Sequence, residues 1–192
     1  MKRLLLLLMT ASLLLAPAAC KKGNPKVEIQ TPEGMILVEL FEDQAPVTVG
    51  NFLKHVKNGV YDGASFYRVV RGTNDKNPVS ISVLQGGVRD KTESGPFDPI
   101  ELETTLQTGV RHLEGTLSMA RDKPGSARTE FFICIRDEPE LDYGGLRNPD
   151  GLGFAAFGRV IGGHMTVNKI YQGRAAGQEL APPVRIHSMR IQ

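Results

Sequence analysis

Four short segments in the middle of the chain combine polar and apolar residues that could act on a ligand. They are Phe66-Tyr67-Arg68, Gln85-Gly86-Gly87, the run from Gly115 to Arg121, and Phe131-Phe132-Ile133. None matches a nucleophile or metal signature: the sequence has no G-x-S-x-G, H-E-x-x-H, phosphate loop or C-x-x-C, and its 4 histidines are scattered. The sequence therefore gives no support to acyl transfer, nucleotide use or metal chemistry, and we expect no cofactor and no metal.

The composition limits what kind of domain positions these segments. With 192 residues, 41% of them hydrophobic, the chain suits one domain with a sizeable core. Its 21 glycines and 12 prolines divide it into short stretches, which favours strands and turns. Without Lys2 and Arg3 the basic and acidic residues balance, and no basic stripe with interleaved aromatics stands out. We expect a mainly β, monomeric protein that does not bind nucleic acid.

The beginning of the chain predicts export. Met1-Lys2-Arg3 is a charged start, and Leu4 to Ala16 is an apolar run interrupted only by Thr10 and Ser12. That run is shorter than the roughly 20 residues that cross a hydrocarbon core of about 30 Å. Residues 1–19 are therefore predicted to be a signal peptide rather than a permanent transmembrane helix.

The small residues before Cys20 resemble the lipobox of bacterial lipoproteins. This resemblance implies that Cys20 carries a lipid such as palmitate, and that residues 20–26 tether a folded domain to a membrane on its periplasmic side. A lysine directly after the cysteine, here Lys21, resembles the pattern of lipoproteins that are sorted to the outer membrane. Pro17 departs from the aliphatic residue usual at its position. Ordinary cleavage is the alternative, and it would leave a soluble periplasmic protein.

The second cysteine, Cys134, is predicted to be structural. If Cys20 is lipidated, Cys134 has no partner for a disulfide. It lies in the apolar run from Phe131 to Ile135, which is typical of a small buried hydrophobe rather than a reactive thiol.

Strands are predicted at both ends of the domain. Val27 to Gln30 and Met35 to Phe41 read as a hairpin, because Pro32 and Gly34 supply turn chemistry between them. Val184 to Ile191 alternates as a half-buried strand does and is expected to return and close a barrel.

Two helices and two long loops complete the expected elements. Apolar residues recur at helical spacing from Thr48, which would cap this helix, to Gly59, which would end it. A second, shorter helix is predicted over Met165 to Tyr171. The segments Gly72 to Val79 and Tyr143 to Gly153 are predicted to be surface loops.

The four segments, in this order, resemble the cyclophilin family, whose pattern runs through Phe-His-Arg, Gln-Gly-Gly, Ser-Met-Ala, Gln-Phe-Phe-Ile and Phe-Gly-Lys-Val. The last item stands here as Phe157-Gly158-Arg159-Val160, and Ala45 to Phe52 is similar to the family's first helix entry. The resemblance covers roughly Val27 to Ile191 and implies a domain at 27–192. The implied fold is a closed barrel of eight antiparallel strands with an α-helix packed at each open end.

The resemblance implies peptidyl-prolyl cis-trans isomerase activity on proline-containing polypeptides, which would assist the folding of exported or envelope proteins. Rotation about an X-Pro bond has a barrier of about 20 kcal/mol and takes tens of seconds without a catalyst. A donor aimed at the prolyl nitrogen stabilises the twisted state, in which the nitrogen lone pair is no longer delocalised. Arg68 matches the family's arginine and presents fixed donors. Gln85 matches the glutamine that holds the substrate backbone and Arg68.

The remaining site residues are also carried over by position. Val83, Met119, Phe132 and Leu141 match the residues that line the proline slot, and Ala120 and Arg121 match those that offer backbone hydrogen bonds to an extended peptide. The chain departs from the family at four positions: Tyr67 replaces His, Glu130 replaces Gln, Glu140 replaces an aromatic residue of some members, and Phe154 replaces His. Tyr67 and Phe154 are still expected to contact the substrate. Glu140 is expected to weaken the binding of cyclosporin-type ligands.

Two other classes of function compete with the enzyme. A cyclophilin-like module could bind proline-containing or unfolded segments without turnover, and Arg68 argues against it. A structural envelope lipoprotein would need only the anchor and a stable barrel, and it would leave the joint presence of Arg68, Gln85, Met119 and Phe132 unexplained.

Overall fold

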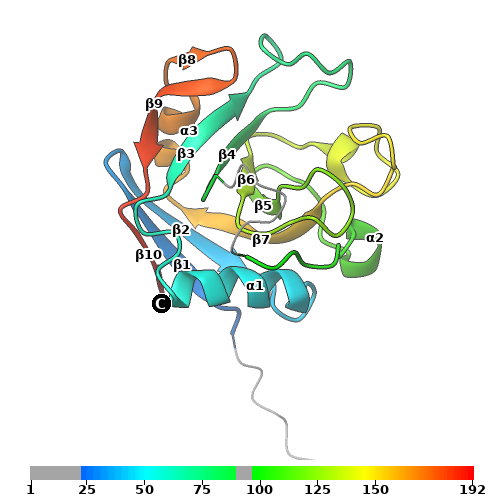
Figure 1. Ribbon diagram of the computed structural model, residues 1–192, viewed down its shortest axis with the longest axis horizontal. Coiled ribbons are helices and arrows are strands. Elements are labelled where there is room, and N and C mark those ends of the chain that lie inside the picture. The colour runs from blue at the N-terminus through cyan, green and yellow to red at the C-terminus, as the bar shows by residue number, and fades with distance from the viewer. Residues whose placement is uncertain (1–22, 90–96) are drawn as a thin grey trace, which may run out of the picture.

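The structure is a computed structural model that describes residues 23–89 and 97–192 (Figure 1). The predicted signal peptide and Cys20 lie outside these residues. The chain opens as the predicted hairpin, β1 (Lys26–Thr31) and β2 (Gly34–Leu40). Every second residue of each strand is buried, as expected for a sheet with one face on the core.

The described chain is mainly β, as predicted. The other strands are β3 (Ser65–Val70), β4 (Val83–Gly87), β5 (Thr116–Met119), β6 (Phe131–Cys134), β7 (Ala155–Gly162), β8 (Ala175–Ala176), β9 (Glu179–Arg185) and β10 (Ser188–Ile191). The helices are α1 (Pro46–Lys57), α2 (Thr105–Thr108), α3 (His164–Tyr171) and the 3-10 turn η1 (Pro139–Leu141). None of the described helices is long and apolar enough to span a membrane.

The prediction of a closed eight-stranded barrel is wrong in strand number and in closure. Within residues 23–89 and 97–192, ten antiparallel strands form one sheet in the order β10-β1-β2-β7-β5-β6-β4-β3-β9-β8, and its end strands are not paired with each other. The reason lies in the C-terminal segment, which is two strands instead of one. β9 pairs with β3, and β10 pairs with β1. Only Ile186 and His187 separate them, so the chain itself, not a hydrogen-bonded ladder, connects the two sides of the sheet.

The main core lies between the sheet and the helices. Phe52 of α1 packs against the rings of Tyr61, Phe131 and Phe157, with centroids 5.2, 5.6 and 5.2 Å away. α1 lies against β10 and β7, and α3 against β2 and β4 (Figure 1). The two predicted helices are therefore present, while the short α2 and η1 were not predicted.

The first helix begins earlier than predicted and is capped differently. Pro46 stands in its first turn, where the lack of an N–H costs nothing, and Thr48 lies inside the helix. The carboxylate of Glu103 replaces the expected cap: its oxygens accept from the backbone N–H of Val47 at 3.1 Å and of Thr48 at 2.7 Å. Gly59 follows the helix with φ +67°, as a residue that ends a helix often does.

His55 predicts a loss of stability in mild acid. It is buried, neither ring nitrogen has a hydrogen-bond partner among the described residues, and its neighbours are the rings of Tyr61 and Phe97. Burial, with a smaller contribution from Lys54, lowers the pKa of His55 from 6.5. Protons therefore bind the unfolded chain first as the pH falls below 6.5. Urea unfolding at pH 7.5 and pH 5.5 should show a smaller free energy of unfolding at the lower pH.

The variant His55→Phe provides the control for this prediction, because it keeps a ring at the site and removes the titration. Its free energy of unfolding should depend less on pH over the same interval. An equal pH dependence in the wild type and in His55→Phe would assign the acid sensitivity to other groups.

Candidate active site

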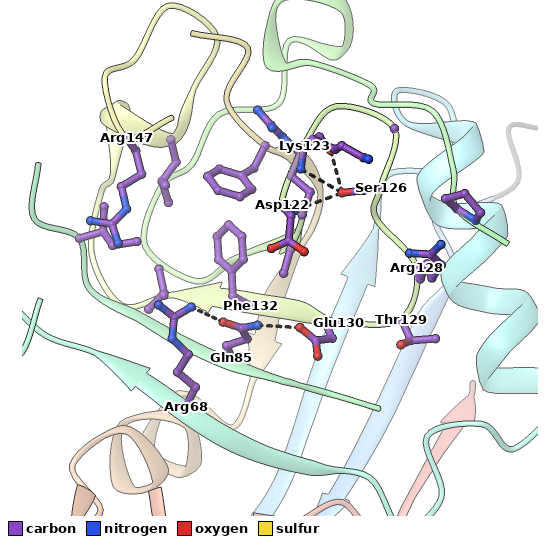
Figure 2. A pocket seen from close by; sticks show the side chains of 18 residues that line it. Arg68, Gln85, Asp122, Lys123, Ser126, Arg128, Thr129, Glu130, Phe132 and Arg147 are labelled. Carbon is purple, nitrogen blue, oxygen red and sulfur yellow. Dashed lines mark hydrogen bonds between the residues drawn. The ribbon is translucent and has the colours of Figure 1, made fainter. Parts of the chain in front are cut away.

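One concave site is a cavity of about 540 Å³ that is open to solvent (Figure 2). It has an apolar part and a polar part. The apolar part is lined by Ile81, Val83, Phe132, Leu141 and Phe154, and the polar part includes Asp122, Lys123, Ser126, Arg128, Thr129 and Glu130. Arg68 and Gln85 also line it, from β3 and β4.

The apolar part is a small hydrophobic cluster separate from the main core. Val83, Phe132 and Leu141 belong to it, with Phe154 packed against its edge. The ring of Phe132 meets that of Phe154 edge to face at 5.4 Å and lies parallel to that of His112 at 6.0 Å. His112 is itself fixed, because its Nδ1 lies 2.7 Å from an Asp142 carboxylate oxygen. These contacts hold the flat face of Phe132 in place as one wall of a slot.

The strand alternation of β6 explains why this slot exists. Phe131 points into the main core and Phe132, the next residue, points into the slot cluster. Met119 of β5, predicted to line the slot, is only 1% exposed, belongs to the main core, and is not among the residues that line the cavity.

Arg68 is held at the edge of the slot by two amide side chains. Its Nη1 donates to Gln85 Oε1 at 2.7 Å, and its Nε and Nη2 both donate to Gln178 Oε1, at 2.9 and 2.7 Å. The pairing with Gln85 was expected from the resemblance, and the strands place it there because Arg68 and Gln85 are direct partners across β3 and β4. Gln178 was missed, since it is 110 residues away in sequence.

Glu130 fixes the orientation of the Gln85 amide (Figure 2). Gln85 Nε2 donates to Glu130 Oε2 at 3.0 Å and to Tyr67 Oη at 2.8 Å, which leaves Gln85 Oε1 facing Arg68. Burial raises the pKa of Glu130, and burial together with the charge of Glu130 raises the pKa of Tyr67. Arg89 lies over the Tyr67 ring at 4.8 Å. Tyr67 thus supports Gln85 from behind and does not itself line the cavity.

Ala120 and Arg121, the two residues predicted to offer backbone hydrogen bonds to a peptide, both line the cavity, but their own hydrogen bonds differ from that prediction. The N–H of Ala120 donates to the carbonyl of Glu130, so only the Ala120 carbonyl is left for a peptide. The side chain of Arg121 is 1% exposed and pairs with Asp150 at 2.8 Å. Its guanidinium also lies 5.3 Å from the centre of the Phe154 ring. Arg121 therefore ties the wall residue Phe154 to the loop before it.

The two predicted surface loops join each other beside the slot. Asp75 of the first and Arg147 of the second form an ion pair of 2.6 Å whose side chains are 2% and 11% exposed. Arg147 also donates to the carbonyl of Val79, and it lines the cavity. Arg147 was not predicted, and the sequence carries no signal for it. Ile81 was not predicted either; it lies two positions before Val83 and belongs to the same hydrophobic cluster at the cavity.

Glu140, expected to weaken cyclosporin-type ligands, is not among the residues that line the cavity, and its carboxylate accepts from the N–H of Leu146. Cys134 is buried, and burial raises the pKa of its thiol, as predicted for a structural cysteine. Within residues 23–89 and 97–192, no cluster of three His, Cys, Asp or Glu side chains is placed to hold a metal ion.

The family of cyclophilin type peptidyl-prolyl cis-trans isomerases matches residues 26–191. Peptidyl-prolyl cis-trans isomerase cyp18 of Streptomyces antibioticus is 36% identical over 86% of this chain and 97% of its own. Peptidyl-prolyl cis-trans isomerase B of Escherichia coli is 34% identical over 79% of this chain and 87% of its own. The crystal structure of a cyclophilin type isomerase of Cryptosporidium parvum superposes with a TM-score of 0.71 and 23% identity, over 88% of this chain and 98% of that one.

The fold is thus the cyclophilin fold. The chain belongs to the cyclophilin-type peptidyl-prolyl cis-trans isomerase family, and its activity is that isomerisation.

Proposed function

We propose that the cavity is the active site, with the proline ring in the Phe132 slot and Arg68 beside the prolyl nitrogen. The observation that carries this proposal is the placement of a fixed guanidinium at the edge of a separate apolar cluster. Proline has an apolar ring and no N–H, so it fits a slot that is lined by apolar side chains and aromatic ring faces. Val83 and Leu141 complete the slot.

Arg68 performs the chemistry by stabilising the twisted amide. Rotation removes the conjugation of the prolyl nitrogen, whose lone pair then accepts a hydrogen bond that the planar ground state accepts poorly. An interaction made mainly in the transition state raises kcat, and no bond to the enzyme forms or breaks. The donors are already oriented by Gln85 and Gln178, so little reorganisation accompanies the rotation.

Proline-containing peptides are the substrate class. The Cryptosporidium parvum isomerase was also crystallised in the presence of the dipeptide Ala-Pro; that structure superposes with a TM-score of 0.70 and 24% identity over 87% of this chain and 98% of that one. Exchange NMR of an Ala-Pro peptide with the purified protein tests the proposal. Binding at the cavity without faster cis-trans exchange would instead favour a non-catalytic binding module.

The cellular role we propose is assistance to the folding of exported or envelope proteins from a lipid anchor on the periplasmic side, in the outer membrane. Its support is the sequence of residues 1–26. The described end of the predicted tether packs on the domain, since the Pro25 carbonyl accepts from the Leu40 N–H at 2.9 Å. The free tether is therefore shorter than residues 20–26.

The substitution Cys20→Ser should move the protein from the membrane fraction to the soluble fraction, because it removes the sulfur that would carry the lipid. Immunoblotting of the fractions measures this, with Cys134→Ser as the control that keeps Cys20. Unchanged partitioning of Cys20→Ser would contradict lipidation and leave the soluble periplasmic alternative.

A further inference from the structure

The turn between β8 and β9 is docked beside Arg68. Ala176 pairs with Glu179, so Gly177 and Gln178 form a two-residue turn, with Gly177 at φ +62°. The backbone carbonyl of Gln178 accepts from the N–H of Val69 at 2.8 Å. This bond fixes the turn to the residue that follows Arg68 on β3, and it brings the Gln178 side chain alongside the guanidinium.

The hydrogen bonds divide the donors of Arg68 into two sets. A guanidinium has five N–H groups in one plane. Gln178 Oε1 accepts one from Nε and one from Nη2, and Gln85 Oε1 accepts one from Nη1. One hydrogen on each terminal nitrogen is left without an acceptor among the described residues. Because Gln178 contacts two atoms of the guanidinium, it fixes the orientation of the plane as well as its position.

Asn74 determines which end of the Gln178 amide faces Arg68. Gln178 Nε2 donates to the backbone carbonyl of Asn74 at 3.3 Å, so Oε1 must point the other way, toward Arg68. Asn74 is itself fixed to the same turn and to β3, since its Nδ2 donates to the Gly177 carbonyl at 2.9 Å and to the Val69 carbonyl at 3.2 Å. The loop from Gly72 to Val79 is thereby connected to the Arg68 guanidinium through the side-chain amide of Gln178.

We propose that Gln178 is a positioning residue for the isomerisation, which holds the Arg68 guanidinium so that its two remaining donors face the proline slot. Asn74 sets the orientation of the Gln178 amide. This inference rests on the proposed role of Arg68. It predicts that Gln178 acts on catalysis only through Arg68.

Gln178→Leu keeps the approximate shape of the side chain and removes the acceptor. We expect kcat for an Ala-Pro peptide to fall on the order of 10- to 100-fold, the size of effect that misplacing a catalytic group produces. KM should stay unchanged, because the slot is intact. Gln178→Glu keeps an acceptor oxygen for Arg68 and should retain most of kcat. Gln172→Leu, the same change at an exposed position after α3, should have no effect.

Two kinetic outcomes would overturn the proposal. The first is a kcat of Gln178→Leu equal to that of Gln172→Leu. The second is a loss from Gln178→Leu that is as large in an Arg68→Ala background as in the wild type, since a residue that acts through Arg68 has nothing left to position there.

A readout that does not depend on turnover separates this inference from the proposed function. The side-chain Nε–H resonance of Arg68, assigned by its loss in Arg68→Lys, should be protected from solvent exchange in the wild type and in Gln172→Leu. It should lose protection in Gln178→Leu. Protection that survives in Gln178→Leu would overturn the positioning role. Intact positioning with an inactive wild type would instead contradict the role of Arg68 in catalysis.

Discussion

Arg68→Ala is expected to lower kcat/KM for an X-Pro peptide on the order of 10²- to 10³-fold, the cost of removing one donor that acts in the transition state. The loss should appear in kcat, because the Phe132 slot that binds the ring is untouched. The fold should persist, since Arg68 contacts amide side chains at the cavity edge and is not part of the hydrophobic core. A protease-coupled isomerisation assay measures the rates, and circular dichroism checks the fold.

Two variants control the Arg68→Ala experiment. Arg68→Lys keeps the charge but not the planar set of donors, so its activity should lie between those of the wild type and Arg68→Ala. Arg159→Ala removes an exposed arginine that pairs with Glu39 on β2 and should leave activity unchanged. Equal kcat in the wild type and in folded Arg68→Ala would remove Arg68 from the mechanism.

Phe132→Ala should raise KM strongly, because it removes the flat face against which the proline ring packs. Truncating this buried ring should also lower the free energy of unfolding by about 3–5 kcal/mol. The matched control is Phe131→Ala. Phe131 is the neighbouring residue on β6 and is equally buried, but it faces the main core. Both variants should lose stability, and only Phe132→Ala should lose substrate affinity.

The comparison between the two phenylalanines isolates binding from folding. Peptide titrations followed by NMR give the affinity, and urea unfolding gives the stability. If either alanine variant fails to fold, the leucine pair at the same positions provides the same comparison with a smaller loss of stability. Equal KM for the two folded variants would show that Phe132 is not a wall of the substrate site.

Elements specified by neighbouring residues were predicted well from the sequence. The β1–β2 hairpin follows from Pro32 and Gly34, and α3 follows from its apolar spacing and flanking glycines. The start of α1 was not predicted well, because its cap is Glu103, which comes from 55 positions along the chain. The prediction of one C-terminal strand was also wrong. The alternating pattern does not indicate that the chain leaves its pairing with β3 and begins to pair with β1 at Ile186 and His187.

Motif position predicted the part of the candidate site that lies on β3, β4 and β6. Arg68, Gln85, Val83 and Phe132 occupy adjacent strands in register, and the structure brings them to one cavity. Met119 shows the limit of that reasoning, because both faces of β5 are buried and position in a motif does not tell slot from core. Loop side chains such as Asp75, Arg147 and Asp150, whose ion pairs hold the cavity wall, have no sequence pattern that identifies them.

The structure adds a second layer of support behind the motif residues. Glu130 orients Gln85 through a hydrogen bond, and Asp142 holds His112 behind Phe132. Gln178 accepts hydrogen bonds from Arg68. A preorganised donor needs such support, because an arginine side chain has many rotamers of its own. The departures of this chain from the family pattern, Tyr67 and Glu130, are therefore compatible with the chemistry, since both act on Gln85 and leave the Arg68–Gln85 bond in place.

NMR exchange spectroscopy of an Ala-Pro peptide with a small molar fraction of the purified protein tests most directly whether this cavity catalyses prolyl isomerisation. If Arg68 catalyses rotation of a proline bound in the Phe132 slot, cis-trans exchange will run well above the uncatalysed rate, together with peptide-induced shifts at Phe132 and Gln85. A folded protein whose Phe132 and Gln85 resonances shift while the exchange rate stays uncatalysed would contradict that role of the cavity.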